Sequence, residues 1–186
     1  EFVEGTSLRD KRDYPIPELI RFFRETATAL AYLHAHKILH ADMKPHHIFV
    51  TSQGHAKILD FGQARLYTDP PGRIQGTVDF MAPEQAKGRV VDPRTDVYGL
   101  GATMYWVLTG ECNRPALSGM GGGVGFTVGY AGRAHSVRDK NPDCPPLLDK
   151  LVIACCERRP EKRPGSMNEV MARLDAMVKT PAAANA

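Results

Sequence analysis

The segment from Arg94 to Thr109, RTDVYGLGATMYWVLT, constrains the fold most because it is apolar almost all the way round. A helix that is hydrophobic on every side is buried inside a protein. The segment stops at Gly110, and glycine is the residue most often found just after a helix end. The sequence therefore predicts a buried helix over 94–109.

Three further segments have the periodicity of helices with one apolar face. One covers 17–34 and begins at Pro17, and another covers 146–156. A third is predicted over 166–178, since Ser166 is followed by Glu169 at the spacing of a capping box. The apolar positions are Leu19, Phe23, Ala27, Leu30 and Leu33, then Leu148, Leu151, Val152 and Cys155, and finally Val170, Leu174 and Met177.

One region has the character of β-structure. The runs IFVT (48–51) and AKIL (56–59) flank SQGH, where Gly54 is placed for a turn, so we expect a short hairpin. Residues 61–93 hold several Pro and Gly without clear periodicity and are predicted to be mostly loop. The fold class expected is a mainly α, bundle-like lobe with one small β-hairpin next to a loop-rich site.

Composition narrows the classes of function. The net charge of +3 is too small to indicate a nucleic-acid partner, and no apolar run approaches the roughly 20 residues that span a bilayer. The four cysteines have no CxxC spacing and are typical of reduced intracellular thiols. We expect a cytoplasmic protein with no membrane segment in this chain.

The stretch ILHADMKPHHIFV, residues 38–50, is where chemistry is most concentrated. It carries His40, Asp42, Lys44, His46 and His47 just before the predicted hairpin. Locally this pattern fits a metal cluster, a catalytic loop or a solvated polar turn. The metal cluster is the least favoured, because the three histidines lack a recognised ligand spacing.

Short motifs in a fixed order favour the catalytic loop. HADMKPHH (40–47) precedes the hairpin, DFG (60–62) follows it, and MAPEQ (81–85) comes after the loop. In this order the chain resembles the protein kinases. The stretch SVRDKNPDCPPLLDKL (136–151) is similar to the bacterial Hanks-type serine/threonine kinases in particular. DVYGLG (96–101) and CCERRPEKRP (155–164) extend the resemblance to the helical C-lobe of the kinase fold. It implies a kinase-like domain over 1–178 and a flexible tail or linker over 179–186.

The resemblance implies a role for each charged residue of these motifs. Asp42 would accept the proton of the acceptor hydroxyl or orient that hydroxyl, and Lys44 would place a cation on the transferred phosphoryl group. Asp60 would hold Mg²⁺ through its carboxylate oxygens. ATP would be the second substrate. Thr77 matches the threonine that bonds to the catalytic Asp and Lys in kinases specific for Ser and Thr of protein substrates.

Apolar and backbone groups complete the implied site. Phe49 stands where family members place an apolar side chain against the adenine, and the hinge that meets the adenine edge would run from Glu1 to Val3. His40 and Phe61 would pack beneath the site. Arg163 would pair with Glu84 across the lobe. Taken singly, any of these charges could be a solvated loop residue, and it is their joint order that favours a kinase.

Three departures from the family pattern affect the function expected. Ala41 replaces the arginine that pairs with a phosphorylated activation loop, so we expect no activation by phosphorylation of that loop. Because this arginine before the catalytic aspartate is missing, we class the chain as a non-RD kinase. His47 stands where the family has the Asn that holds a second Mg²⁺; imidazole is a poor ligand for Mg²⁺ but acceptable for Mn²⁺ or Zn²⁺. The alternative is that His47 only hydrogen-bonds the Asp42 loop, as that Asn also does. The third departure is that no GxGxxG or VAIK motif occurs, and the glycine-rich run 119–129 lacks the required spacing.

Two functions therefore remain open from the sequence. The first is an ATP-dependent protein serine/threonine kinase, of which this chain would be a piece lacking the nucleotide-covering lobe and inactive by itself. The alternative is a pseudokinase or scaffold that binds partners without phosphotransfer. Asp42, Lys44 and Asp60 together favour the kinase, whereas His47 and the absent motifs favour the scaffold.

Overall fold

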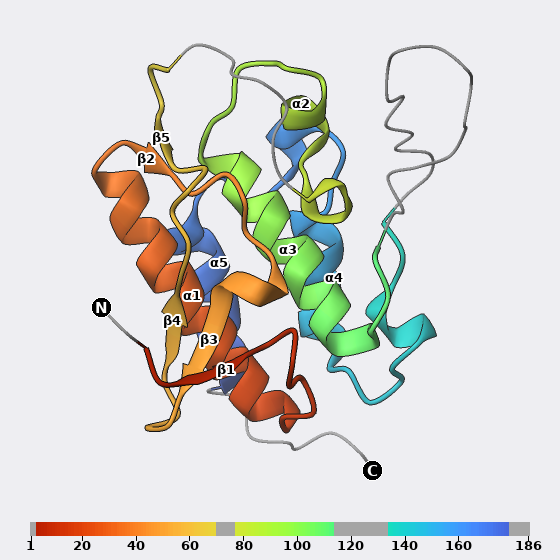
Figure 1. Ribbon diagram of the computed structural model, residues 1–186. Helices are drawn as coiled ribbons and strands as arrows, with labels where there is room; N and C mark the ends of the chain where they lie inside the picture. The colour runs from red at the N-terminus through yellow and green to blue at the C-terminus, as the bar shows by residue number, and fades with distance from the viewer. Residues whose placement is uncertain (1–2, 70–76, 114–133, 179–186) are drawn as a thin grey trace, which may run out of the picture.

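The central helix α3, Pro93–Thr109, has the other elements of the lobe arranged around it (Figure 1). The computed structural model describes residues 3–69, 77–113 and 134–178. All residues of α3 from Thr95 to Leu108 are buried, which confirms the prediction for this segment. Asp92 caps its first turn by accepting a hydrogen bond from Arg94 N at 2.7 Å, and Gly110 ends it with φ 80°.

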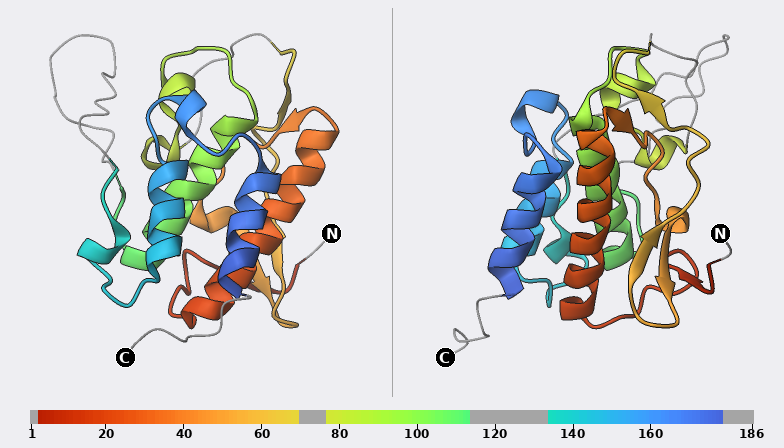
Figure 2. Two further views of the ribbon diagram at one scale, coloured as in Figure 1. Left: turned by 180° about the vertical axis from the view of Figure 1, so that it is seen from behind. Right: turned by 90° about the vertical axis from the view of Figure 1, so that its left-hand side faces the viewer.

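The three amphipathic helices pack around α3 with their apolar faces inward. They are α1 (Ile16–Ala35), α4 (Pro146–Cys155) and α5 (Met167–Val178), each within two residues of its predicted bounds. Helix α5 lies along α1, and α4 lies along α3 (Figure 2). Their shared core includes Phe23, Leu30, Leu151 and Leu174, each with at most 1% of its surface exposed.

The predicted hairpin is present and belongs to a larger sheet. Strands β3 (Ile48–Thr51) and β4 (Ala56–Ile58) pair antiparallel around a turn in which Gly54 has φ 78°. A further strand, β1 (Gly5–Ser7), pairs antiparallel with the outer edge of β3, giving the order β1-β3-β4. The sequence does not predict β1, because three residues are too few to show a period.

The region 61–93 contains more regular structure than the loop that was predicted. A second sheet pairs β2 (Ile38–Leu39) with β5 (Arg65–Leu66). Short turns of helix follow at Val78–Phe80 and in α2 (Pro83–Ala86). The fold class is nevertheless the one expected, a helix-rich lobe with small sheets.

Several expectations fall outside the described residues. They concern Glu1 of the expected hinge, the glycine-rich run 119–129 and the tail 179–186. Among the helices that are described, none combines the length and the apolar character needed to cross a membrane.

Candidate functional site

The loop after β2 is fixed to the buried helix by one carboxylate. Asp96, in the first turn of α3, is 1% exposed and accepts hydrogen bonds from His40 N at 2.9 Å and Ala41 N at 2.8 Å. His34 Nε2 lies 2.8 Å from the same carboxylate. No sequence motif pointed to Asp96 as an anchor, and the His34 side chain beside it is only 9% exposed. A carboxylate within an otherwise apolar helix was the signal that could have revealed this anchor.

The next residues of the loop lie directly against α3. A Cβ atom at Gly99 would stand 3.1 Å from Met43 Cβ, so the missing side chain lets the loop approach the helix. Thr103 Oγ1 lies 3.4 Å from Met43 O, one turn further along α3. The buried helix thus supports the loop from its first residue to Met43.

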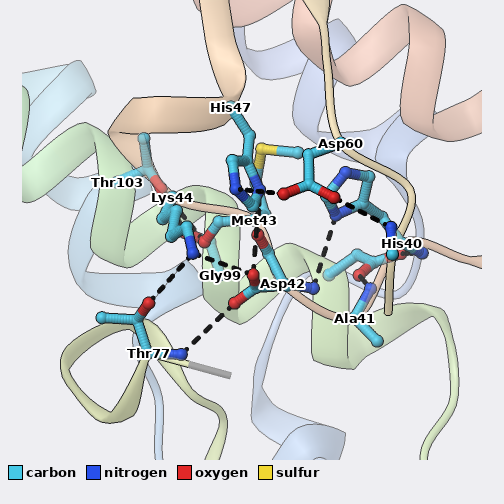
Figure 3. A network of polar contacts seen from close by, with 12 residues as sticks. His40, Ala41, Asp42, Met43, Lys44, His47, Asp60, Thr77, Gly99 and Thr103 are labelled. Atoms are coloured by element: carbon cyan, nitrogen blue, oxygen red, sulfur yellow. Dashed lines mark hydrogen bonds and ion pairs between the residues drawn. The ribbon is translucent and has the colours of Figure 1, made fainter. Parts of the chain in front are cut away.

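Asp42, Lys44 and Thr77 form one hydrogen-bonded cluster above this support (Figure 3). Lys44 Nζ donates to Asp42 Oδ2 at 3.0 Å and to Thr77 Oγ1 at 3.1 Å. Thr77 N donates to the other carboxylate oxygen, Asp42 Oδ1, at 3.3 Å. The Asp42 and Lys44 side chains are only 11% and 18% exposed, so their attraction is weakly screened. A hollow beside the cluster is lined by Ala41, Asp42, Met43, Thr77, Phe80, Met81 and Gln85.

Asp60 presents an ionised carboxylate at the opposite side of the loop. Its backbone has φ 64°, and Oδ1 accepts a hydrogen bond from Gly62 N at 2.9 Å. That hydrogen bond, helped by His47, holds the pKa of Asp60 below its ordinary value. The side chain is 62% exposed, so the carboxylate is charged at neutral pH and open to solvent.

His47 bridges the two carboxylate residues. Its ring is 7% exposed, with Nδ1 at 2.8 Å from Asp42 O and Nε2 at 3.3 Å from Asp60 Oδ2. Burial of the ring, with the cation of Lys44 nearby, lowers the pKa of His47 from its ordinary value. This shift favours the neutral form of the ring.

The donor groups fit a divalent cation that is shared with a nucleotide. No group of three or more His, Cys, Asp or Glu side chains that could hold a metal occurs in the described parts of the chain, so the metal cluster of His40, His46 and His47 is not formed. Mg²⁺ in phosphoryl-transfer sites uses one or two carboxylates and takes its remaining ligands from phosphates and water. Asp60 by itself supplies the one carboxylate that such a site needs.

The two residues expected beneath the site differ in their environment. His40 is fully buried, and its Nδ1 lies 3.4 Å from Asp42 N. Phe61 meets the His40 ring edge-on at 5.4 Å, but 50% of Phe61 is exposed. Phe61 therefore packs on the buried His40 but keeps half of its surface exposed.

The residues expected to meet adenine lie on or beside the three-stranded sheet. Ile48 and Val50 are buried in the core, so the intervening Phe49 faces the opposite side of β3, where it is half-buried. Val3 is half-buried and precedes β1. Contact of either residue with a nucleotide stays a prediction.

Glu84 and Arg163 form the expected pair, and both side chains are buried. Arg163 Nη1 and Nη2 donate to Glu84 Oε1 and Oε2 at 2.7 and 2.8 Å, in a two-pronged arrangement. The Arg163 and Glu84 side chains are 0% and 8% exposed. Thr95 Oγ1 also donates to Glu84 Oε1 at 3.0 Å, which ties the MAPE segment to the first turn of α3.

Comparison with known proteins agrees with this geometry. The family model described as protein kinase domain matches residues 1–174. The chain belongs to the protein kinase family. It is 34% identical to serine/threonine-protein kinase PknB of Mycolicibacterium smegmatis and 37% identical to PknB of Mycobacterium tuberculosis H37Rv, over 94% of this chain in each case. A probable serine/threonine-protein kinase of Clostridium acetobutylicum is 30% identical over the same share.

These similarities confirm the resemblance to bacterial Hanks-type kinases. The matches cover 29%, 29% and 27% of the three relatives, so the chain spans less than a third of their length. Kinases of this family use ATP and a divalent cation.

Proposed function

We propose that this chain forms the acceptor side of a protein serine/threonine kinase site, which transfers the γ-phosphoryl group of ATP to Ser or Thr of protein substrates. The observation that carries the proposal is the cluster of Asp42, Lys44 and Thr77, with both Asp42 oxygens engaged at 3.0 and 3.3 Å. Lys44 and Thr77 are 33 residues apart in the sequence and are joined by a hydrogen bond. Two solvated loop residues would have no reason to form it.

Phosphoryl transfer needs positioning and charge neutralisation more than covalent chemistry from the protein. ATP bound with a divalent cation supplies the phosphoryl group. Asp42 orients the acceptor hydroxyl and takes up its proton on a carboxylate oxygen. Lys44 Nζ neutralises negative charge on the oxygens of the transferred phosphoryl group. Thr77 holds both partners, through Oγ1 to Lys44 and through its backbone N–H to Asp42. This double contact is the basis for assigning Ser and Thr as acceptors.

The remaining assignments concern the nucleotide. Asp60 is the carboxylate that holds the divalent cation, Mg²⁺ being the ordinary ion, because it is ionised and exposed. Phe49, on the partly open face of β3, is assigned to contact with the adenine ring. The backbone from Glu1 to Val3 is assigned to contact with the edge of the adenine.

Transfer of radiolabelled phosphate to a generic protein acceptor tests the proposal in the full-length protein that the gene encodes. Asp42→Asn removes the proton acceptor, and we expect the rate to fall roughly 10²–10⁴-fold. Asp60→Asn should abolish transfer because the cation loses its carboxylate. Asp143→Asn, at an exposed aspartate just before α4, is the matched control and should leave the rate unchanged. Equal transfer by Asp42→Asn and wild type would refute the assignment.

The second candidate is a pseudokinase that binds partners without phosphotransfer. The observation in its favour is His47, whose ring lies against Asp60 at the position where the family has Asn. A full-length wild type that transfers no phosphate with Mg²⁺ or Mn²⁺ would favour this candidate. Recovery of transfer in His47→Asn would identify the histidine as the cause.

A further inference from the structure

One end of the lobe carries a group of surface cations that the proposed mechanism does not use. They come from three segments, which are the residues after α2, the first turn of α3 and the stretch between α4 and α5. These segments lie at the same end of the lobe in Figure 1 and in Figure 2. The members of this basic patch are Lys87, Arg89, Arg94, Arg158, Arg159 and Lys162; Arg94 is half-buried and the others are exposed.

The Glu84–Arg163 pair holds these segments together. Arg163 Nη1 donates to Arg94 O at 2.8 Å, and Nη2 donates to Arg158 O at 3.3 Å. On the other side of the pair, Glu84 O accepts a hydrogen bond from Arg89 N at 2.9 Å. Cations that are far apart in the sequence are therefore fixed around one buried centre.

The positive charge of the patch is not compensated within the described residues. None of its six side chains forms an ion pair or a hydrogen bond there. The same segments contain three surface carboxylates, those of Asp92, Glu157 and Glu161, and the Asp92 side chain already caps α3. The patch thus has a net charge of +3, the value for the whole chain. Like charges gathered in this way repel one another, so the stability of the fold does not account for the cluster.

The patch adjoins the acceptor side of the site through α2. In this short helix Glu84 pairs with Arg163, whereas the next residue, Gln85, donates to Ala41 O at 2.6 Å. Gln85 also lines the hollow beside Asp42. A protein that contacts the patch can therefore reach the Asp42 carboxylate with another part of its chain.

We propose that the basic patch is a docking surface for an acidic segment of the protein substrate. Four of the six cations are arginines, whose planar guanidinium donates two parallel hydrogen bonds to a carboxylate. Cations spread over three segments fit an extended run of carboxylates better than a single anion. The inference rests on the proposed function, which brings protein substrates to this chain, and it specifies a feature of those substrates.

Val90 adds an apolar contact to the patch. It is 76% exposed, the largest fraction among the large apolar residues of the described segments, and it follows Arg89 in the loop between α2 and α3. An apolar side chain in the acidic segment would cover Val90 and remove its surface from water. The segment that fits the patch is thus rich in Asp and Glu and contains an apolar residue.

Binding of a labelled peptide to the full-length protein without ATP tests the docking surface. The probe is a fluorescein-labelled run of glutamates with one central leucine, followed by fluorescence anisotropy. Arg89→Glu combined with Arg159→Glu replaces attraction by repulsion within the patch, and we expect binding to weaken about tenfold. Lys11→Glu with Lys150→Glu, at exposed lysines elsewhere, changes the net charge equally and should leave binding unchanged.

Two single variants locate the contact. Val90→Ser should weaken binding about threefold, because the leucine of the peptide loses part of its apolar contact. Asp42→Asn should bind the peptide as tightly as the wild type, since the patch lies outside the cluster of Asp42, Lys44 and Thr77. Circular dichroism verifies that each variant is folded.

Steady-state phosphate transfer separates docking from a structural role. The acceptor is one protein, used with and without the acidic segment attached. For the acceptor with the segment, Arg89→Glu/Arg159→Glu should raise KM about tenfold and leave kcat unchanged. For the acceptor without it, this variant should match the wild type, whereas damage to the lobe would lower kcat for both acceptors.

Three results would overturn the proposal. They are peptide binding that survives in Arg89→Glu/Arg159→Glu, equal weakening by the lysine control pair, and no peptide binding by the wild type. Wild-type binding to phosphatidylserine vesicles in place of the peptide would assign the patch to a lipid surface and would overturn it as well. Peptide binding without phosphate transfer would refute only the proposed function, and transfer without peptide binding would refute only this inference.

Discussion

Arg163 shows how a single buried side chain determines the position of a motif far away in the sequence. Its guanidinium donates to both oxygens of Glu84 and to the backbone carbonyl oxygens of Arg94 and Glu157, at 2.7 to 2.8 Å. A fully buried cation is tolerated only when its donors are satisfied and a counter-charge is present. The pair therefore holds the MAPE segment in one place relative to α3.

The costs of removing the two partners of this pair should not add. Glu84→Gln or Arg163→Met leaves a buried charge unpaired, and we expect each to lower the free energy of unfolding by about 3–5 kcal/mol, measured by urea denaturation. The double variant should cost clearly less than the sum of the two. The exposed pair Lys140–Glu111 is the control, and its cycle should give under about 1 kcal/mol. Additive costs for Glu84 and Arg163 would mean that the two do not interact.

Helices α3 and α4 approach closely because one residue has no side chain. A Cβ atom at Gly101 would stand 2.5 Å from Cys155 Cβ and 3.2 Å from the Cys155 carbonyl carbon. Real Cβ atoms do not come this close, so the two helices meet at this glycine. The crossing in turn fixes α4 and the segment that leads to Arg163.

Gly101→Ala should destabilise the lobe despite the better helix propensity of alanine. Alanine gains up to about 1 kcal/mol in a helix, but overpacking costs about 1–3 kcal/mol when backbone has to move. We expect a lower midpoint of thermal unfolding than in wild type. Gly165→Ala is the comparison, since a methyl group added there would have the flexible Glu169 Oε2 as its nearest neighbour, at 3.7 Å. A Gly101→Ala variant as stable as wild type would show that α4 can shift freely.

Across the whole molecule, the segment between DFG and α2 is held at both of its described ends. Near its start, Tyr67 O–H donates to His34 O at 3.0 Å, and Tyr67 packs against the small cluster of Leu39, Ala41 and Val91. Just past its end, within α2, Gln85 Nε2 donates to Ala41 O at 2.6 Å. Ala41 therefore contributes apolar contact and a backbone acceptor where the family has an arginine.

Activity should consequently not depend on phosphorylation of this segment. Without the arginine, a phosphate here has no partner at position 41, and the described contacts already hold the segment. Phosphatase treatment of the full-length protein should leave its rate of phosphate transfer unchanged, with mass spectrometry verifying that phosphate has been removed. Loss of activity on treatment would contradict the prediction.

The sequence by itself determined the helices, the hairpin and the family. Local patterns were enough for the helices and the hairpin, because they show which side of each segment is buried and where it ends. These patterns are the apolar spacing in 17–34, 94–109, 146–156 and 166–178 and the glycines at 54 and 110. The order of the HADMKPHH, DFG and MAPE motifs carried the resemblance, and the Glu84–Arg163 pair followed from it.

Only the tertiary structure decided which side chains support the site. The hydrogen bonds of Asp96 to residues 55 and 56 positions earlier, the pairing of β1 with β3, and the exposure of Phe61 depend on segments that are distant in the sequence. So does the contact of His47 Nε2 with Asp60 Oδ2 at 3.3 Å. A periodic pattern or a motif shows which side of one segment is buried. A hydrogen bond between two segments depends on how the fold brings them together.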